Sequence, residues 1–410
     1  MSPKPVGRMR ILVLSAQYPR NDNPTSGIYV QEQVAALRRA GADARALVGR
    51  ETWLGPSRPL FSLNALRRFA FSRPQLEWRE QFGVLYAEFP TVAVGHLGEG
   101  IRSYCYAAGL RRVGGEIRRD FPFEVIHAHT ALLDGAAASE LKAEFDVPLV
   151  TTEHTGPLSV ITRTRHMRRR VRRALLNSDR VVAVSNALAR TIRQTFPELN
   201  LSIDIIPNGV DERLFAVAPQ LPVSRLRKTI LWVGSFDPLK RPLLALAAFA
   251  AIAERRPEFN LRFIGRGSLE VVMRREVERL GLGGRVRIDD YYDRVKLAGV
   301  MSRASMLMVT STVETFSLVT IEALSCGVPV VSTRCGGPED ILVEPWLGRL
   351  SEDSLEALTA ALLEITSTLA DFRAVRLRAY AVDRFGMNVV AERYIALYQE
   401  VMSGFPATTG

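Results

Sequence analysis

Short apolar runs alternate with helical patterns along this chain, and the alternation occurs in two series. Apolar runs that end in polar residues predict strands at 10–16, 124–129, 147–154, 180–185, 203–209, 229–235, 260–267, 285–290, 305–312 and 328–333. Apolar residues at helical spacing predict helices at 28–41, 241–257, 268–283 and from about 317. Strands that alternate with helices form right-handed βαβ units and a parallel sheet, so the sequence predicts an α/β fold.

The two series are separated by a segment without periodicity, "AVAPQLPVSRLRK" at 216–228. We interpret it as a linker between an N-terminal domain, 1–215, and a C-terminal domain, 229–385. The tail, 386–410, contains an amphipathic helix that could cap either domain, and we expect it to return to the first. Ligands of doubly wound sheets bind beyond the carboxyl ends of the strands. We therefore predict two Rossmann-like domains that face each other across a cleft.

Charge and cysteine content limit the partners and the compartment. The formal net charge of +11, carried mostly by arginine, favours nucleic acid, anionic lipid or phosphorylated ligands, without choosing among them. Three cysteines without metal-type spacing indicate a reducing compartment. The first apolar run, 11–16, is too short for a signal peptide, and no run approaches the roughly 20 residues that span a bilayer. We expect a cytoplasmic protein.

Two glutamates flank a turn in the stretch "TSTVETFSLVTIEALSCGVPVVSTRCGG", residues 310–337. Glu314 follows a buried strand, and Glu322 lies inside the next predicted helix. The free amides at the start of that helix, Phe316 to Val319, suit an anionic phosphate. The carboxylates can accept hydrogen bonds from the hydroxyls of a sugar or a ribose. Taken singly, Glu314 could equally be a helix cap and Glu322 a solvated helix residue.

The whole block "ETFSLVTIEALSCGVPVVSTRCGGPEDIL" resembles the E-x7-E signature of retaining glycosyltransferases with the GT-B fold, the family 4 (group 1) type. Shorter matches follow in the expected order over most of the chain: "VIHAHTALLDGAAA", "LVTTEHTGPLS", "VVAVSNALA", "IPNGVD" and "WVGSFDPLKRP". The resemblance implies the GT-B architecture and transfer of a sugar from a nucleoside-diphosphate donor.

The resemblance also implies roles on the donor side. Glu314 would bind hydroxyls of the transferred sugar, and Glu322 would bind the ribose. Lys240 would neutralise the departing diphosphate as its charge develops. Gly265, in a strand-to-helix turn, would lie near the base. The amides that would approach the sugar and the diphosphate are those of Phe316, Ser317, Leu318 and Val319.

On the acceptor side, the resemblance matches His154, at the end of a predicted strand, to the active-site histidine of the family. His129, in the other histidine-bearing loop, is a candidate binding residue. Gly27 precedes the first predicted helix and would let a phosphate or the acceptor approach the backbone.

The chain departs from the family pattern at two positions. Ser235 stands where an arginine usually follows Val-Gly, so a second cation on the diphosphate is missing there. Arg241, beside Lys240, is the candidate replacement, although an arginine at a helix start can point elsewhere. Ser317 stands where the family often has glycine, and serine is a good helix cap.

Two clusters raise the question of a metal. His127 and His129 share one face of a strand and, with His154, suggest a zinc site, but no cysteine or carboxylate completes a familiar ligand set. A buried histidine bonded to backbone is the alternative for His127. The run "IDDYYD" (288–293) resembles a metal-binding aspartate element, although caps of a loop are more typical of such residues. We predict no obligatory metal and no cofactor besides the donor substrate.

The segment 163–173 holds seven arginines in eleven residues, with Met167, Val171 and Leu175 recurring every fourth residue. Such a helix can dock on anionic lipid, or it can be a solvated helix packed on its own core. Nucleic acid is disfavoured because no aromatics interleave the arginines. The basic and aromatic segment 66–79 is interpreted as an inserted loop over the acceptor side.

We therefore predict a retaining, metal-independent glycosyltransferase with a glycan, a lipid-linked or a small-molecule acceptor. The alternatives are a non-catalytic nucleotide-sugar-binding protein, which the missing arginine at Ser235 favours, and an epimerase on the same fold.

Overall fold

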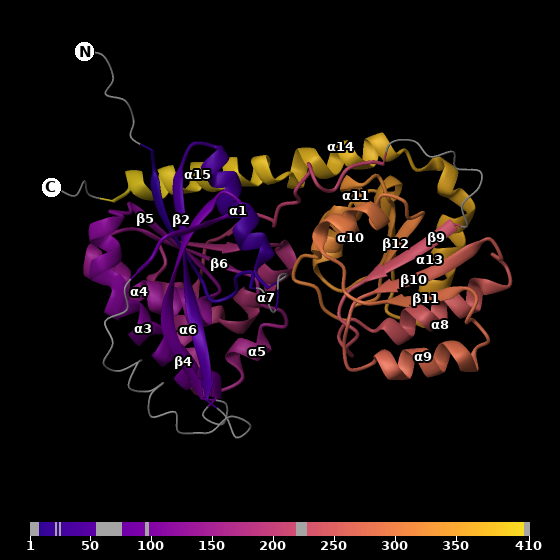
Figure 1. Ribbon diagram of the computed structural model, residues 1–410, viewed down its shortest axis with the longest axis horizontal. Helices are drawn as coiled ribbons and strands as arrows, with labels where there is room; N and C mark the ends of the chain where they lie inside the picture. The colour runs from indigo at the N-terminus through magenta and orange to yellow at the C-terminus, as the bar shows by residue number, and fades with distance from the viewer. Residues whose placement is uncertain are drawn as a thin grey trace, which may run out of the picture. The chain divides into compact units, whose positions relative to one another are not determined.

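The computed structural model describes residues 8–20, 23, 26–54, 76–94, 98–218 and 228–405. These residues form two compact units (Figure 1). Unit 1 contains the described residues up to Val184, Ala189–Pro207 and the segment from Val390 onward; unit 2 contains Ser185–Leu188 and Asn208–Val389. Most of the linker predicted at 216–228 and most of the loop predicted at 66–79 lie outside the described residues.

Unit 1 contains an eight-stranded sheet in the order β3-β4-β2-β1-β5-β6-β7-β8, parallel except for β3, which is antiparallel to β4. The strands are β1 (Arg10–Ser15), β2 (Asp43–Leu54), β3 (Arg79–Gln81), β4 (Val84–Val94), β5 (Val125–His129), β6 (Leu149–Glu153), β7 (Arg180–Ala183) and β8 (Ile203–Ile205). The helices along this part of the chain are α1 (Ile28–Arg39), α3 (Gly98–Asp120), α4 (Ala136–Phe145), α5 (Ser159–Thr162), α6 (Arg165–Asn177) and α7 (Asn186–Thr195), with a π-helical turn, η1 (Ala131–Gly135), before α4.

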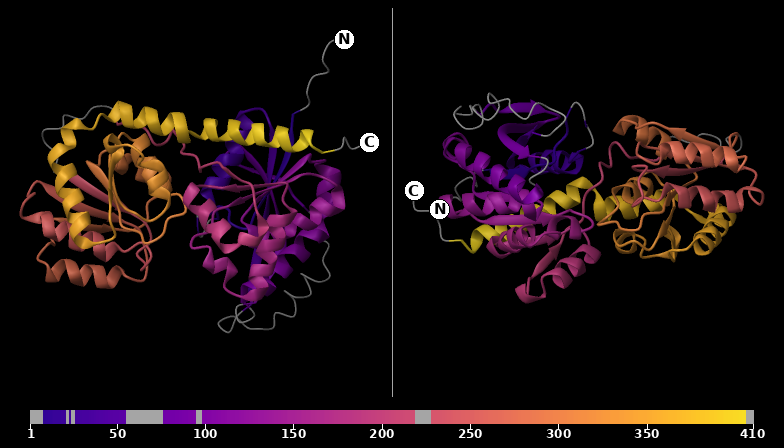
Figure 2. Two further views of the ribbon diagram at one scale, coloured as in Figure 1. Left: turned by 180° about the vertical axis from the view of Figure 1, so that it is seen from behind. Right: turned by 90° about the horizontal axis from the view of Figure 1, so that it is seen from below.

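Both faces of this sheet are covered, which explains why its central strands read as continuous apolar runs. Helices α3, α4 and α6 lie on one side, and α1 and the C-terminal helix α15 (Met387–Ser403) lie on the other (Figure 1). Leu12 and Leu14 of β1 pack with Leu110 of α3 and Leu141 of α4 in one buried cluster. Figure 2 shows the same layers from behind and from below.

Unit 2 contains a six-stranded parallel sheet in the order β11-β10-β9-β12-β13-β14. The strands are β9 (Lys228–Val233), β10 (Phe259–Ile264), β11 (Val286–Asp289), β12 (Met306–Val309), β13 (Val330–Thr333) and β14 (Gly348–Ser351). The helices are α8 (Pro242–Ala253), α9 (Glu270–Arg279), α10 (Arg294–Met301), α11 (Leu318–Ser325), α12 (Gly337–Ile341), α13 (Leu355–Thr368) and α14 (Ala374–Phe385). Helix α8, "PLLALAAFAAIA", is apolar around most of its circumference because it lies in the core.

Each sheet has a point where the strand order reverses. In unit 2, β9 lies between β10 and β12, and in unit 1, β1 lies between β2 and β5. Loops at the carboxyl ends of these strands diverge, and ligands of such sheets bind there. The loops after β9 and β12 carry Lys240 and Glu314, and the loops after β1, β5 and β6 carry Gly27, Thr130 and His154.

The α/β class and the ten predicted strands are confirmed. Strands β2, β3, β4 and β14 were missed: β2 is interrupted by charged residues, β4 contains Pro90, and β3 and β14 are only three and four residues long.

Candidate active site

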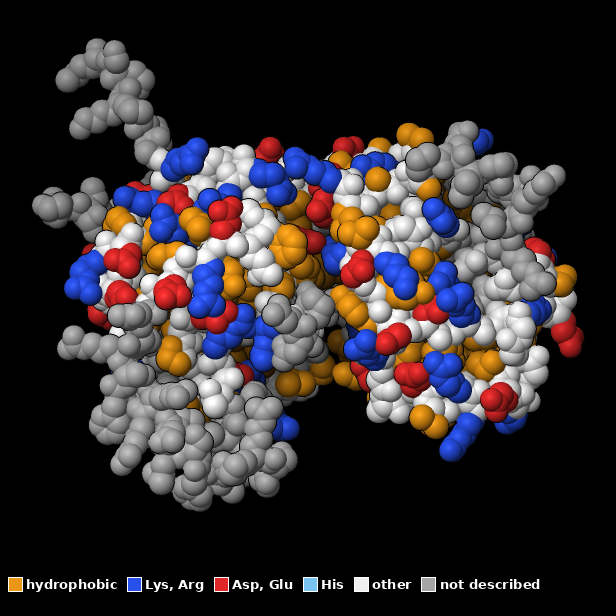
Figure 3. Space-filling model, viewed as in Figure 1, with side chains coloured by type: hydrophobic (Ala, Val, Ile, Leu, Met, Phe, Trp, Pro, Cys, Tyr) orange, Lys and Arg blue, Asp and Glu red, His pale blue; other side chains and the backbone are white. Residues whose placement is uncertain are grey.

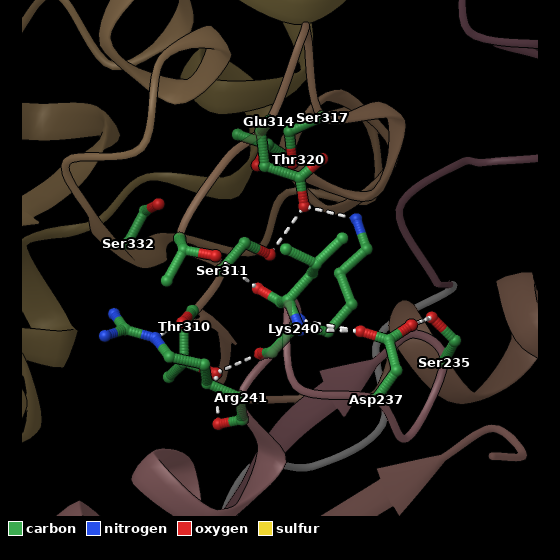
Figure 4. Close-up of polar contacts among 12 residues, drawn as sticks. Ser235, Asp237, Lys240, Arg241, Thr310, Ser311, Glu314, Ser317, Thr320 and Ser332 are labelled. Carbon is green, nitrogen blue, oxygen red and sulfur yellow. Dashed lines mark hydrogen bonds and ion pairs between the residues drawn. The ribbon is translucent and has the colours of Figure 1, made fainter. Parts of the chain in front are cut away.

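Lys240 and Glu314 meet at the carboxyl edge of the unit 2 sheet. They follow the neighbouring strands β9 and β12, and the Lys240 Nζ donates to the Glu314 Oε1 at 2.6 Å (Figure 4). The Glu314 side chain is 11% exposed and that of Lys240 is 32% exposed. The two residues are 74 positions apart in sequence and are adjacent only because β9 and β12 are paired. A cation and a carboxylate are thus held side by side at an edge open to a ligand.

Neighbouring groups fix this pair in position. The Ser311 hydroxyl donates to the same Oε1 of Glu314 at 2.7 Å. The Asp237 carboxylate accepts the backbone N–H of Lys240 at 2.9 Å and so shapes the turn that presents the lysine. Behind that turn, the Thr310 hydroxyl donates to the Lys240 carbonyl at 2.8 Å and accepts the indole N–H of Trp232 at 3.0 Å. Ser311, Asp237 and Thr310 were not identified from the sequence, because a small polar residue in a loop carries no distinctive signal.

The start of α11 leaves a set of backbone donors beside Glu314. Among the described residues, no acceptor is found for the amides of Phe316, Ser317, Leu318 and Val319. Helix N-termini with free amides attract anions. The expected cap is wrong: the Ser317 hydroxyl makes no capping bond and instead pairs with the Thr320 hydroxyl at 2.9 Å. The reason is the left-handed backbone of Ser317, with φ of 84°, which is the conformation that favours glycine.

Glu322 is buried, with 3% of its side chain exposed, and forms an ion pair with Arg294 of α10. The solvated-helix reading of Glu322 is therefore wrong. The guanidinium of Arg294, 19% exposed, also lies 4.7 Å from the centre of the Phe215 ring. Arg294 was missed from the sequence because only the packing of α10 against α11 brings it to Glu322.

The three remaining donor-side residues lie on loops of the same edge. Ser235 is hydrogen-bonded to Asp237, and Arg241 points away from Glu314 (Figure 4). The Arg241 guanidinium bonds the Thr310 carbonyl at 2.8 Å and pairs with Asp353, so it is already engaged away from Lys240. Gly265 is required by packing, since a Cβ there would lie 1.8 Å from the Gly234 carbonyl oxygen.

At the corresponding edge of unit 1, the buried His127 and His129 and the partly exposed His154 form a network. The His129 Nδ1 lies 2.9 Å from the His154 Nε2, and the two rings stack 5.1 Å apart. The Tyr29 ring, on α1, packs 4.6 Å from His154. Burial lowers the pKa of His129 well below its usual range, with smaller contributions from the other histidines. His129 is therefore held as a neutral imidazole that is hydrogen-bonded to His154.

His127 is buried but is bonded to side chains, so the backbone partner expected from the sequence is wrong. Its Nε2 lies 2.8 Å from the Thr152 hydroxyl and its Nδ1 lies 2.7 Å from the Tyr398 hydroxyl of α15. Burial lowers the pKa of His127 to about 3. Because Thr152 also contacts the Tyr394 hydroxyl at 3.1 Å, the C-terminal helix is tied to β5 and β6.

Two buried carboxyl groups beside this network were missed. The Glu153 carboxylate accepts the amides of Ala131 at 2.8 Å and Thr155 at 2.7 Å. Asp134, in η1, accepts the Tyr106 hydroxyl at 2.6 Å, and burial raises its pKa to about 7. Asp134 could have been found as a lone acidic residue inside the apolar run "TALLDGAAA", whereas Glu153, between Thr152 and His154, has no comparable signal.

Gly27 immediately precedes α1 with φ of 63°, and a Cβ there would lie 2.0 Å from the Gln17 carbonyl oxygen. Only glycine fits between the loop that follows β1 and the start of α1. Parts of that loop, residues 21, 22, 24 and 25, lie outside the described residues.

The described residues contain no group of three or more His, Cys, Asp or Glu side chains arranged to hold a metal ion. Asp289 pairs with Arg262 at 2.7 Å, Asp290 pairs with Arg266, and Asp293 caps α10 by accepting the Lys296 amide at 2.8 Å. The aspartate run thus consists of ion-pair partners and a helix cap.

Two doubly wound units are the architecture of GT-B glycosyltransferases. The Lys240–Glu314 pair beside the unpaired amides at the N-terminus of α11 is compatible with a donor site of that class. Residues 219–371 match the family described as "Glycosyl transferases group 1", and residues 27–214 match "Glycosyltransferase Family 4". The chain belongs to this family and is a glycosyltransferase.

Relatives and solved structures agree with this assignment. The chain is 30% identical over 329 residues to a D-inositol 3-phosphate glycosyltransferase of Segniliparus rotundus, covering 73% of this chain and 71% of the relative. It is 24% identical to an N-acetyl-alpha-D-glucosaminyl L-malate synthase of Bacillus anthracis, covering 72% and 80%. A sucrose-phosphate synthase from Thermosynechococcus elongatus has the same fold, with a TM-score of 0.75 at 20% identity, covering 97% and 100%. Anabaena HepE in complex with UDP and glucose gives a TM-score of 0.67 at 18% identity, covering 96% and 100%.

Proposed function

We propose that this glycosyltransferase is a retaining enzyme that uses a nucleoside-diphosphate sugar, with the donor bound at the carboxyl edge of unit 2. The observation that carries the proposal is the 2.6 Å contact between Lys240 and Glu314 beside the free amides of α11. The diphosphate takes Lys240 and those amides, and Glu314, released from the lysine, accepts the sugar hydroxyls. Glu322 binds the ribose. The solved structures of Anabaena HepE, which contain UDP or UDP-glucose, support a nucleotide-sugar donor by their common fold.

In the proposed reaction the bond between the sugar C1 and the phosphate oxygen breaks as the acceptor oxygen bonds to C1 from the same face. The acceptor proton passes to the departing phosphate, and Lys240 offsets the negative charge that develops there. The charges of Lys240 and of the α11 start make this donor site independent of metal. On unit 1, His154 and His129, together with the backbone at Gly27, position the acceptor.

We also propose a setting for the reaction: synthesis of a polysaccharide or glycolipid at the inner face of a membrane, by a cytoplasmic protein that associates peripherally through residues 163–173. The acceptor is then a glycan or a lipid-linked glycan. No helix in the described part of the chain is long and apolar enough to cross a membrane. The stripe of Met167, Val171 and Leu175 is buried in unit 1, so the proposed association rests on the exposed arginines and involves no insertion of these residues.

The test is release of nucleoside diphosphate from UDP-, GDP- and ADP-sugars, with and without a glycan or lipid-linked acceptor. We expect acceptor-dependent release with one donor, and a loss of at least about 100-fold in Glu314→Gln. Glu352→Gln, at an exposed ion pair of the same unit, is the control that should retain turnover. Wild-type turnover in Glu314→Gln would refute the role of Glu314.

One alternative has a specific observation in its favour. Ser235 stands where the family usually has an arginine, and the candidate replacement, Arg241, is paired with Asp353. A site with one cation fewer for the diphosphate fits a protein that binds the nucleotide sugar without transferring the sugar. Acceptor-dependent release of the diphosphate excludes this alternative. A rearranged sugar formed without any acceptor would instead identify an epimerase.

A further inference from the structure

A groove of unit 1 with a volume of about 660 Å³ is lined by α3, α4 and α6. Its floor consists of small side chains of α4, which begins "AAASELKAEF", among them Ala136, Ser139 and Ala143. Longer side chains of α3 and α6 form the walls. The groove therefore exists because a helix of short residues lies between two helices of long ones.

The walls of this groove are cationic. Arg111 of α3 and Arg169, Arg170 and Arg173 of α6 line it, against one carboxylate, that of Glu140. Lys and Arg side chains gather over α6 in the space-filling view (Figure 3). A concave site with one sign of charge concentrates ligands of the opposite charge.

The arginines of the groove differ in their side-chain contacts within the protein. Arg170 donates to the Ser103 hydroxyl at 2.7 Å and lies 4.2 Å above the Tyr104 ring, so it is fixed as part of the wall. Arg111 pairs with Glu140 at 3.2 Å. Arg169 and Arg173 are exposed, and within the described ranges neither side chain has a hydrogen bond or an ion pair. Four residues apart, they lie on one face of α6 with their Cβ atoms about 5–6 Å apart.

The clustered arginines of α6 destabilise the helix electrostatically unless an anion binds to them. Like charges four residues apart destabilise a helix, and cations near its N-terminus oppose the helix dipole. Helix α6 carries six arginines and no acidic residue, and Arg165 and Arg168 lie near its N-terminal end. An anion bound between Arg169 and Arg173 relieves this repulsion.

We propose that this groove is a binding site for the phosphate groups of a polyanionic ligand, with Arg169 and Arg173 as the principal contacts. Guanidinium groups bind phosphate through paired N–H donors, and two of them on successive turns suit a ligand with more than one phosphate. The fixed Arg170 and Tyr104 form one wall of the site. The phosphates come either from a soluble compound or from phospholipid headgroups; the second source rests on the membrane association proposed above.

The test compares two double variants of the full chain with equal loss of charge. R169Q/R173Q removes the groove contacts, and R163Q/R165Q removes two exposed arginines of the same segment that do not line the groove. In the soluble arm, sodium tripolyphosphate is titrated calorimetrically. In the lipid arm, the protein is sedimented with vesicles of phosphatidylglycerol and phosphatidylcholine, and with vesicles of phosphatidylcholine alone.

We expect R169Q/R173Q to weaken binding at least tenfold in one arm, and at least threefold more than R163Q/R165Q, whose exposed arginines contribute only a general attraction to an anionic surface. Loss confined to tripolyphosphate identifies a soluble ligand, and loss confined to anionic vesicles identifies headgroups. Equal losses in the two variants, or no binding in either arm, overturn the proposal. Turnover with a soluble acceptor should be unchanged in R169Q/R173Q, so failure here is distinct from failure of the proposed transfer reaction.

Discussion

The carboxyl edges of the two sheets solve the problem of buried polar groups in opposite ways. Unit 2 holds charges in pairs, Lys240 with Glu314 and Arg294 with Glu322. At the unit 1 edge the buried rings of His127 and His129 are uncharged, since burial lowers the pKa of His127 to about 3 and that of His129 well below its usual range, and the Glu153 carboxylate is held by backbone amides and not by a cation. In a charge pair, a charged ligand can replace the residue that has the same sign as the ligand. A network of neutral side chains instead keeps a fixed hydrogen-bond geometry.

The difference fits the two kinds of substrate proposed. A diphosphate brings negative charge and needs Lys240, while a sugar brings hydroxyls and needs Glu314. An acceptor hydroxyl is neutral, and in the proposed reaction the buried, uncharged His129 orients the partly exposed His154 through their 2.9 Å hydrogen bond. Three sets of variants test this difference between the units, from the largest expected effect to the smallest.

Arg294→Met should lower the stability of unit 2 by about 3–5 kcal/mol, because it leaves the carboxylate of Glu322 buried without its ion-pair partner. Chemical denaturation of the purified variant measures this. Arg334→Met removes an arginine whose pair with Glu352 is exposed, and should cost less than about 1 kcal/mol. Equal effects in the two variants would mean that Glu322 does not depend on Arg294.

His127→Gln should flatten the dependence of stability on pH. The pKa of His127 is about 3 in the folded protein and about 6.5 in the unfolded chain, so unfolding takes up a proton between these values. The wild type therefore loses about 1.4 kcal/mol per pH unit from this group as the pH falls from about 6 to 4. Denaturation midpoints across that range should show the loss removed in His127→Gln.

Tyr398→Phe is the matched control for that slope, since it removes a hydrogen bond to His127 and keeps the histidine. It should lower stability by about 1 kcal/mol at every pH and leave the slope unchanged. A slope that stays the same in His127→Gln would show that this ring is not buried in neutral form.

Ser317→Gly and Ser317→Ala separate backbone strain from side-chain bonding. Both variants lose the contact with Thr320, but only glycine adopts the φ of 84° without strain. We expect the glycine variant to be more stable than the alanine variant by about 1 kcal/mol, measured by thermal unfolding. An alanine variant as stable as the glycine variant would place Ser317 outside the left-handed region.

The fold could be predicted because its signals are local, whereas the donor-side roles follow from the family resemblance and stay predictions. Apolar runs marked the strands, and the two glutamates with the turn between them marked the start of α11. Their partners could not be predicted, because sequence does not show which loops meet. Arg294 of α10 pairs with Glu322 of the adjacent helix α11, and Tyr398 bonds to His127, which lies 271 residues earlier in the sequence. The direction of Arg241 depends on Asp353, which lies 112 residues further along the chain.

The most direct test of the account measures the affinity of a nucleoside diphosphate and of its sugar derivative by calorimetry in Lys240→Met and Glu314→Gln. We predict that Lys240→Met weakens binding of the diphosphate about 10- to 100-fold, since it removes a charged hydrogen-bond donor. Glu314→Gln should retain the diphosphate and lose the additional affinity that the sugar provides. If both variants bind both ligands as the wild type does, Lys240 and Glu314 do not hold the donor.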